Sequence, residues 1–188
     1  MSWLEIAAVV TSFLAIWLTA KRRMLCWPIN LIACALYFKL FLDVRLYSDM
    51  VLQALFGAGI VYGWIVWARG KADDGIVVVQ RLAPKHATIA LIAGAAGAVA
   101  IGWFTSHYTN AALPWIDATL TSFSLVAQYW AARRHAANWL AWIVIDAVYV
   151  GMFVFKGLIP TAGLYAAMIA LAVVGYKSWQ APRAQAEG

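Results

Sequence analysis

The sequence predicts an all-α membrane protein with seven transmembrane helices, in which two parallel three-helix repeats flank one linker helix, a 3+1+3 arrangement. Three observations predict this fold class: an apolar composition, seven apolar runs of spanning length, and an internal repeat. Hydrophobic residues make up 65% of the chain and charged residues 12%, whereas a soluble domain is about half apolar. The composition therefore excludes an ordinary soluble domain and indicates a protein whose partner is the lipid bilayer.

Seven apolar runs are each long enough to cross the hydrocarbon core, which takes about 20 helical residues. They cover residues 3–20, 24–42, 46–68, 86–105, 115–132, 138–155 and 158–179. Charged or helix-breaking residues separate consecutive runs. We expect no cleaved signal peptide, because no basic segment precedes the first run and Lys21, Arg22 and Arg23 follow it.

The basic residues are distributed unevenly over the two sides of the predicted bundle. Of the 14 Lys and Arg residues, Lys39, Arg45 and Lys156 fall on one side and all others on the opposite side. Because cytoplasmic loops carry the excess of Lys and Arg, we expect the N-terminus outside and the C-terminus in the cytoplasm. The net charge of +6 is then a topology signal, and we expect no nucleic-acid partner.

A fixed shift relates the two halves of the chain, since each residue pairs with the residue 112 positions later, as Trp3 does with Trp115. The other distinctive pairs are Glu5 with Asp117, Ser12 with Ser124, Trp27 with Trp139, Tyr37 with Tyr149, Phe41 with Phe153, Leu46 with Leu158, Gly63 with Gly175 and Trp67 with Trp179. The predicted units are a first repeat in residues 1–68, a cytoplasmic loop and linker helix in 69–112, a second repeat in 113–179 and a disordered tail in 180–188. Parallel repeats of this kind hold substrate between them near the membrane midplane.

The span 138–155 carries one acidic residue, Asp146, near its middle. Trp139, Trp142 and Tyr149 fall on the same helical face, at spacings of three and four. Burying a carboxylate at that depth costs about 3 kcal/mol, so Asp146 is a candidate for ligand binding. The alternative is a structural Asp that only links two helices by hydrogen bonds.

Other spans also carry polar or aromatic residues on one face, such as Asn30 and Tyr37 in the equivalent helix of the first repeat and Asp49 in the third span. Polar faces on several helices need a shared interior, which is either a wet cavity or a sealed hydrogen-bond network. We favour the cavity. The candidate substrate-binding residues are Asp146, Trp142, Tyr149, Trp139, Gln53, Asn30, Tyr37, Gln128, Ser124, Thr121, Asp117 and Trp64.

Several residues have a structural explanation as well. Asp117 follows Pro114 at a helix start, where the helix dipole stabilises an acid, so a structural cap is an equal alternative to a ligand contact. Trp67, near the cytoplasmic end of its span, fits an interfacial aromatic belt, and Trp64 fits it less well. In the span 86–105, small residues at every fourth position predict a close-packing seam; they are Ala90, Gly94, Ala98 and Gly102.

The pattern does not indicate catalysis or a metal site. His86, His107 and His135 are far apart in the sequence, and Cys26 and Cys34 lie in or beside a span, so we expect neither a metal site nor a disulfide framework. No nucleophile stands beside a base at catalytic spacing, so we expect no enzyme and no cofactor. A non-transporting membrane scaffold is a further alternative.

Four short segments are distinctive in combination. They are Ser2-Trp3-Leu4-Glu5; Leu46-Tyr47 together with Gln53 and Tyr62-Gly63-Trp64; Trp115-Ile116-Asp117; and Asn138-Trp139 through Trp142 and Asp146. Together they resemble the nicotinamide riboside transporters of the PnuC type, over nearly the whole chain. The resemblance implies a multi-pass protein of the bacterial inner membrane that works by facilitated diffusion, with a fold similar to a full-length version of the SWEET sugar transporters.

The resemblance also implies a vitamin substrate, which is nicotinamide riboside or, as alternatives among relatives, thiamine or riboflavin. One departure is Ile60, where members of this family often carry an Asn, and the loss of that polar group bears on the choice of ligand. A flat cationic ring would stack on Trp139, Trp142 or Tyr149 by cation–π attraction, with Asp146 as counter-ion. The sequence leaves open which vitamin is bound and whether the chain forms a homo-oligomer.

Overall fold

The computed structural model describes residues 3–43, 47–70, 77–109, 113–155, 157 and 159–184. Over these residues the chain forms seven α-helices: α1 (Trp3–Ala20), α2 (Cys26–Asp43), α3 (Tyr47–Ala68), α4 (Pro84–Tyr108), α5 (Pro114–Ala132), α6 (Ala137–Phe155) and α7 (Ile159–Ala184). Each helix coincides with one predicted span to within a few residues.

Some sequence-based expectations fall outside the described part of the chain. The side chains of Glu5 and Asp49 are among these, as are residues 44–46, Lys156 and Leu158. The tail predicted for residues 180–188 is described only in part, because α7 continues to Ala184 and residues 185–188 lie outside the described part. Residues 180–184 are therefore helical, where disorder was expected.

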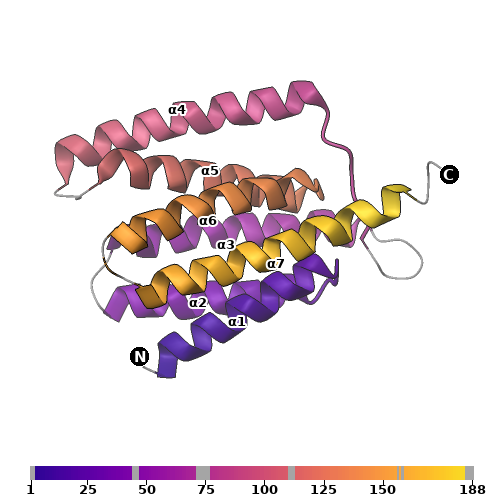
Figure 1. The fold of residues 1–188 in the computed structure, drawn as a ribbon, viewed down its shortest axis with the longest axis horizontal. Coiled ribbons are helices and arrows are strands. Elements are labelled where there is room, and N and C mark those ends of the chain that lie inside the picture. Colours follow the sequence, from indigo (N-terminus) through magenta and orange to yellow (C-terminus); the bar gives the residue numbers. More distant parts are fainter. Residues whose placement is uncertain are drawn as a thin grey trace.

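The helices lie side by side along the long axis of the molecule, with α4 at one edge (Figure 1). Helix α1 packs on α2 and α2 on α3, and we call these helices the first three-helix unit; α5 packs on α6 and α6 on α7, and we call these the second. The two units meet where α3 packs on α5 and α1 packs on α7, and α4 packs on α5. The α1–α2 and α5–α6 turns lie at the same end of the bundle (right in Figure 1), which we call the turn end.

The α1–α2 and α5–α6 turns share one backbone conformation. A non-glycine residue with positive φ ends the first helix of each pair, at 55° for Arg22 and 66° for Arg134, a conformation that costs about 1 kcal/mol per residue. Matching backbone N–H groups donate to carbonyls of the last helical turn: Arg23 to Leu18 at 3.0 Å and His135 to Trp130 at 2.8 Å. These bonds cap both helices in the same way.

Helix α4 packs on α5 through the predicted seam. Gly94, Ala98 and Gly102 are buried on α4, which confirms the prediction at these positions. The Ser122 hydroxyl on α5 donates to the Gly94 carbonyl at 2.7 Å, and a Cβ at Gly102 would lie 2.5 Å from the Trp115 ring. Glycine is therefore needed for the close approach of the two helices.

The segment 77–80, which we call the strap, joins the end of α3 to the α5–α6 turn. The Gln80 N–H donates to the Arg134 carbonyl at 2.9 Å, and the His135 Nδ1–H donates to the Gln80 carbonyl at 3.1 Å. The Arg134 guanidinium donates to the Gly70 carbonyl at 3.2 Å. Val77 is fully buried in the core at the turn end, so the strap is packed as well as hydrogen-bonded.

The helices expose apolar side chains over the outside of the bundle, for example Val10, Ile92 and Val144. Three helical segments are long and apolar enough to cross a membrane by themselves: Pro84–Tyr108, Ala137–Phe155 and Thr161–Gln180. Shorter apolar helices cover Ile6–Ala20, Cys26–Leu40 and Leu52–Ala68. Such a surface suits lipid as the surrounding solvent.

Candidate functional site

A cavity of about 430 Å³ lies inside the bundle, between the two three-helix units. Residues of α1, α2, α3, α5, α6 and α7 line it, and none of the described residues of α4 does. Pockets for small organic ligands generally measure about 300 to 1,000 Å³. The space therefore suits a molecule of nucleoside size.

The cavity brings together most of the predicted binding residues, from four different helices. Those that line it are Asn30, Tyr37, Gln53, Ser124, Gln128, Trp139, Trp142, Asp146 and Tyr149. The helices that carry them are α2, α3, α5 and α6. A shared interior was expected from the polar faces, and the structure places a cavity there.

Three predicted residues do not line the cavity. Asp117 is exposed in the first turn of α5, the position that the helix dipole favours for an acid. Thr121 lies a turn nearer the start of α5 than Ser124, the first residue of that helix in the lining. Trp64 is exposed on α3, because the buried face of that helix is centred on Ile60, Gly63 and Trp67.

Several lining residues were not among the sequence-based candidates. They include Ser12, Thr19, Cys34, Phe56, Ile60, Asn138, Tyr165 and Met168. The repeat offered a signal for some of them, since Ser12 pairs with Ser124, and Tyr165 and Met168 pair with Gln53 and Phe56. Ile60, the residue at which this chain departs from the expected pattern, is buried and lines the cavity.

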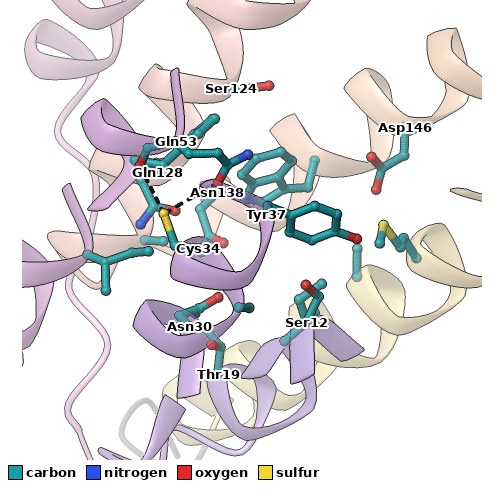
Figure 2. Close-up of a pocket in the computed structure, with 18 of the residues that line it drawn as sticks. Ser12, Thr19, Asn30, Cys34, Tyr37, Gln53, Ser124, Gln128, Asn138 and Asp146 are labelled. Atoms are coloured by element: carbon teal, nitrogen blue, oxygen red, sulfur yellow. Dashed lines mark hydrogen bonds between the residues drawn. The ribbon is translucent and has the colours of Figure 1, made fainter. Parts of the chain in front are cut away.

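Asp146 approaches the cavity from α6 beside an aromatic wall. Its side chain is only 6% exposed, and Figure 2 shows its carboxyl group directed into the cavity. The rings of Tyr149 and Tyr165 lie 4.7 Å apart, and Phe153 stacks on Tyr149 at 5.9 Å. A negative group beside aromatic faces is a favourable environment for a flat cation, since both attract positive charge.

The opposite wall is polar but uncharged. The Cys34 thiol on α2 lies 2.9 Å from the Gln53 main-chain oxygen and 3.3 Å from Gln53 Oε1, so it helps to hold the Gln53 side chain (dashed lines in Figure 2). Asn30 and Gln128 add amide groups to the lining. Amides supply both donors and acceptors to a ligand that carries hydroxyl or carboxamide groups.

At the turn end, the cavity lining contains an amide that uses one of its two N–H donors in a hydrogen bond to the protein. Asn138 at the start of α6 is fully buried, and its Nδ2–H donates to the His135 carbonyl at 2.7 Å. This bond fixes the side chain next to the α5–α6 turn. The cavity therefore connects through Asn138 to the turn that the strap also contacts.

Equivalent positions of the two units carry different chemistry. Asp146 corresponds to Cys34 and Trp142 to Asn30, at the shift of 112 positions, although the backbone elements match. The carboxyl group of Asp146 and the indole of Trp142 thus lie in the second unit, and the thiol and the amide that correspond to them lie in the first. The two sides of the cavity therefore differ in charge and polarity, with the carboxyl group on the α6 side.

The described residues contain no group of three His, Cys, Asp or Glu side chains that could hold a metal ion. Cys26 and Cys34 are both free. The polar groups around the cavity are suited to reversible binding by stacking, charge and hydrogen bonds.

Comparison with known proteins gives a match over almost the whole chain. The profile of the family described as "Nicotinamide mononucleotide transporter" matches residues 2–181. The chain is 23% identical over 206 residues to the nicotinamide riboside transporter PnuC of Escherichia coli (strain K12), covering 95% of this chain and 85% of the relative. It is 28% identical over 180 residues to the riboflavin/roseoflavin transporter RibM of Streptomyces davaonensis, covering 94% and 84%.

A solved structure shows the same fold. The crystal structure of the vitamin B3 transporter PnuC superposes with a TM-score of 0.74 at 25% sequence identity, covering 95% of this chain and 81% of that chain. The likeness extends over the helices that form the cavity.

Proposed function

The chain belongs to the nicotinamide mononucleotide transporter family, and from this premise we propose that it carries nicotinamide riboside across the bacterial inner membrane by facilitated diffusion. The protein is a transporter of the vitamin type, as its relatives are. The observation that carries the choice of substrate is the buried Asp146 beside the aromatic wall in a cavity of nucleoside size. We propose no enzymatic activity for it.

The substrate's chemistry matches the two walls of the cavity. Nicotinamide riboside has a permanently charged pyridinium ring, which gains about 1 to 2 kcal/mol from cation–π attraction when it stacks on Trp142 or Tyr149 in a dry site. Asp146 then acts as counter-ion or accepts hydrogen bonds from ribose hydroxyls. Gln53 and Asn30 on the uncharged wall would bind the hydroxyl and carboxamide groups.

The proposal includes a parallel 3+1+3 repeat, with the cavity near the membrane midplane. Two cross-unit hydrogen bonds support it, because they relate to each other by the same shift of 112 positions. The Trp67 Nε1–H donates to the Ala131 carbonyl at 3.0 Å, and the Trp179 Nε1–H donates to the Thr19 carbonyl at 3.1 Å. The two capped turns at Arg22 and Arg134 match in the same way.

We further propose that the turn end faces the cytoplasm, with the N-terminus outside. The support is the excess of Lys and Arg at this end, which carries Arg22, Arg23, Arg133 and Arg134 in its turns. Cytoplasmic loops are enriched in these residues. A single marker cysteine at Ala83, exposed beside the strap, would react with an impermeant thiol reagent only from the cytoplasmic side.

Riboflavin is the second candidate, because the relative RibM is named for riboflavin and roseoflavin transport. The apolar Ile60 in the wall would suit the larger and neutral flavin ring. Thiamine, another flat cation, is a third candidate on the same electrostatic grounds as nicotinamide riboside. A membrane scaffold without transport activity is the alternative that the flux assay excludes or supports.

The proposal is tested by uptake into proteoliposomes that contain the purified protein. We expect labelled nicotinamide riboside to equilibrate across the bilayer without an ion gradient, faster than through protein-free vesicles. Excess unlabelled riboflavin and thiamine, added separately, rank the three candidates. Uptake that requires a proton or sodium gradient would contradict facilitated diffusion, and the absence of any flux would contradict transport.

A further inference from the structure

Four buried tryptophans form a continuous row at the turn end. Trp27 contacts Trp67 with ring centroids 5.2 Å apart, Trp67 contacts Trp179 at 5.8 Å, and Trp179 contacts Trp139 at 5.6 Å. The two outer contacts are both edge-to-face, at 87° and 88°. We call these four residues the tryptophan row.

The row lies between the cavity and the turn end. Its outer members, Trp27 and Trp139, line the cavity. Its inner members, Trp67 and Trp179, are 0% and 1% exposed, and Val77 of the strap packs in the same cluster. Indole rings therefore fill the space through which a ligand would leave toward the turn end.

The contacts of the row divide into two kinds. The outer contacts lie within one three-helix unit, where each outer indole rests on a glycine of the third helix. A Cβ at Gly63 would collide with the Trp27 ring, and a Cβ at Gly175 would lie 2.6 Å from the Trp139 ring. These seats are rigid, because the ring and the helix backbone leave no room for a side chain.

The inner contacts cross between the two units. They are the Trp67–Trp179 ring contact and the two indole hydrogen bonds, from Trp67 to the Ala131 carbonyl and from Trp179 to the Thr19 carbonyl. If the units separate at the turn end as rigid bodies, these three interactions break together while the glycine seats stay intact. The row can therefore separate between Trp67 and Trp179, where the two units meet.

The closed row also contains unsatisfied polar groups. The indole N–H groups of Trp27 and Trp139 are buried and have no hydrogen-bond partner among the described residues. A buried donor without an acceptor favours any arrangement that gives it one. Separation of the two units would let water reach the indole N–H groups of Trp27 and Trp139. The inner contacts therefore stabilise the closed state, and hydration of these two groups favours its opening.

We propose that the tryptophan row is the gate that closes the cavity at the turn end, and that it opens by parting of Trp67 from Trp179. This inference rests on the proposed transport function, because a gate has meaning only for a cavity that releases a ligand. The strap connects the two units beside the Trp67–Trp179 contact, through Gln80 and Arg134, and limits how far they separate.

The native Cys34 thiol provides a reporter that needs no knowledge of the substrate. It lines the cavity, and replacing the buried Cys26 by Ser leaves it as the single cysteine. In vesicles of known orientation, assigned with the Ala83→Cys marker in a Cys34→Ser background, an impermeant methanethiosulfonate reagent is added to one side. The rate of Cys34 labelling from the turn end measures opening of the gate.

The informative variant is Trp67→Phe combined with Trp179→Phe, which keeps two rings and removes both cross-unit hydrogen bonds. We expect labelling of Cys34 from the turn end to become about tenfold faster, because the closed state loses two hydrogen bonds. The matched control is Trp103→Phe on α4, a half-exposed ring away from the row, which should leave the rate unchanged. An unchanged rate in the double variant, or equal acceleration by the control, would overturn the proposal.

A second pair of variants serves if the double variant does not fold. Gly175→Ala pushes Trp139 off its seat, whereas Gly163→Ala on the same helix meets nothing within 4 Å. We expect faster labelling of Cys34 in Gly175→Ala and an unchanged rate in Gly163→Ala, and identical rates in the two variants would overturn the gate. Because the assay contains no vitamin, a protein that shows gated labelling but no nicotinamide riboside flux contradicts the proposed substrate and leaves the gate standing.

Discussion

Asp146 on α6 and Cys34 on α2 face the same cavity from positions 112 residues apart. An acid in one unit thus stands where the other unit has a thiol, and the cavity is negative on one side only. Inside a bundle, away from water, a single charge has a long reach. The two residues therefore give the cavity a direction, which a symmetric pair of helices alone would not.

Replacing Asp146 by Asn should weaken binding of nicotinamide riboside about 10- to 100-fold, because a hydrogen bond to a charged group contributes about 1.5 to 3 kcal/mol. Isothermal titration calorimetry on purified protein measures the change. Asp117→Asn, at the exposed start of α5, is the matched control and should bind as the wild type does.

The reduced, neutral form of the nicotinamide riboside ring adds a test of the charge itself. The wild type should prefer the cationic form, and the Asp146→Asn variant should discriminate little between the two. Equal loss of affinity for both forms would mean that Asp146 acts through packing or hydrogen bonding and not as a counter-ion.

Tyr165→Leu should weaken binding about 3- to 10-fold, because an aromatic pair contributes about 0.5 to 1.5 kcal/mol beyond its buried area. Tyr165 supports Tyr149 in the wall beside Asp146. Tyr108→Leu, on the exposed end of α4, is the control. Affinity that stays at the wild-type value in Tyr165→Leu would remove this residue from the site.

Gly102→Ala should lower the thermal stability of the detergent-solubilised protein. The new methyl group would lie 2.5 Å from the Trp115 ring, and overpacking of this kind costs about 1 to 3 kcal/mol. Gly151→Ala, where nothing lies within 4 Å of the added Cβ, should be neutral or stabilising, since Ala favours helix over Gly by about 1 kcal/mol. A lower melting temperature for Gly151→Ala than for Gly102→Ala would contradict the seam.

Acid should loosen the strap. Burial lowers the pKa of His135 below its ordinary value of 6.5. The hydrogen bond to the Gln80 carbonyl raises this pKa, and the charges of Arg133, Arg134 and His86 lower it, so that the pKa stays below 6.5. Because the folded state then takes up the proton less readily than the unfolded chain, His135 opposes folding as pH falls below about 6.5. The contribution is absent at neutral and higher pH, where the ring is neutral in both states.

Melting temperatures of the wild type and of His135→Asn, recorded between pH 8 and pH 5, test this sign. Asn keeps a donor near the Nδ1 position and does not titrate in this range. The wild type should lose stability relative to the variant on acidification, and a gain relative to the variant would show that His135 becomes protonated in a favourable contact.

The positions of the helices were predictable, because an apolar run of spanning length allows little else in lipid. The candidate site was predictable where a polar group interrupts an apolar span, as at Asp146, Asn30 and Gln53. Some of its other members come from a helix, α7, whose sequence has no such contrast. Tyr165 and Met168 sit among apolar residues of α7 and become lining residues only through the packing of α7 on α6.

The side of a helix on which a residue faces was harder to predict from the sequence. The aromatic-belt interpretation of Trp67 is wrong, because its ring is fully buried between the two units. Trp64, three residues earlier, is exposed. The sequence of an indole at the end of a span is the same whether the ring faces lipid headgroups or a neighbouring helix. Gly63 and Gly175, which pair in the repeat, are each the seat of an indole ring.

A structure of the protein with bound nicotinamide riboside tests the central claim most directly. We expect the pyridinium ring to stack on Trp142 or Tyr149 between the two three-helix units, with Asp146 within hydrogen-bond or ion-pair distance of the ligand and Gln53 or Asn30 at its other end. A ligand bound outside this cavity, or inside it with its ring away from α6, would contradict the account.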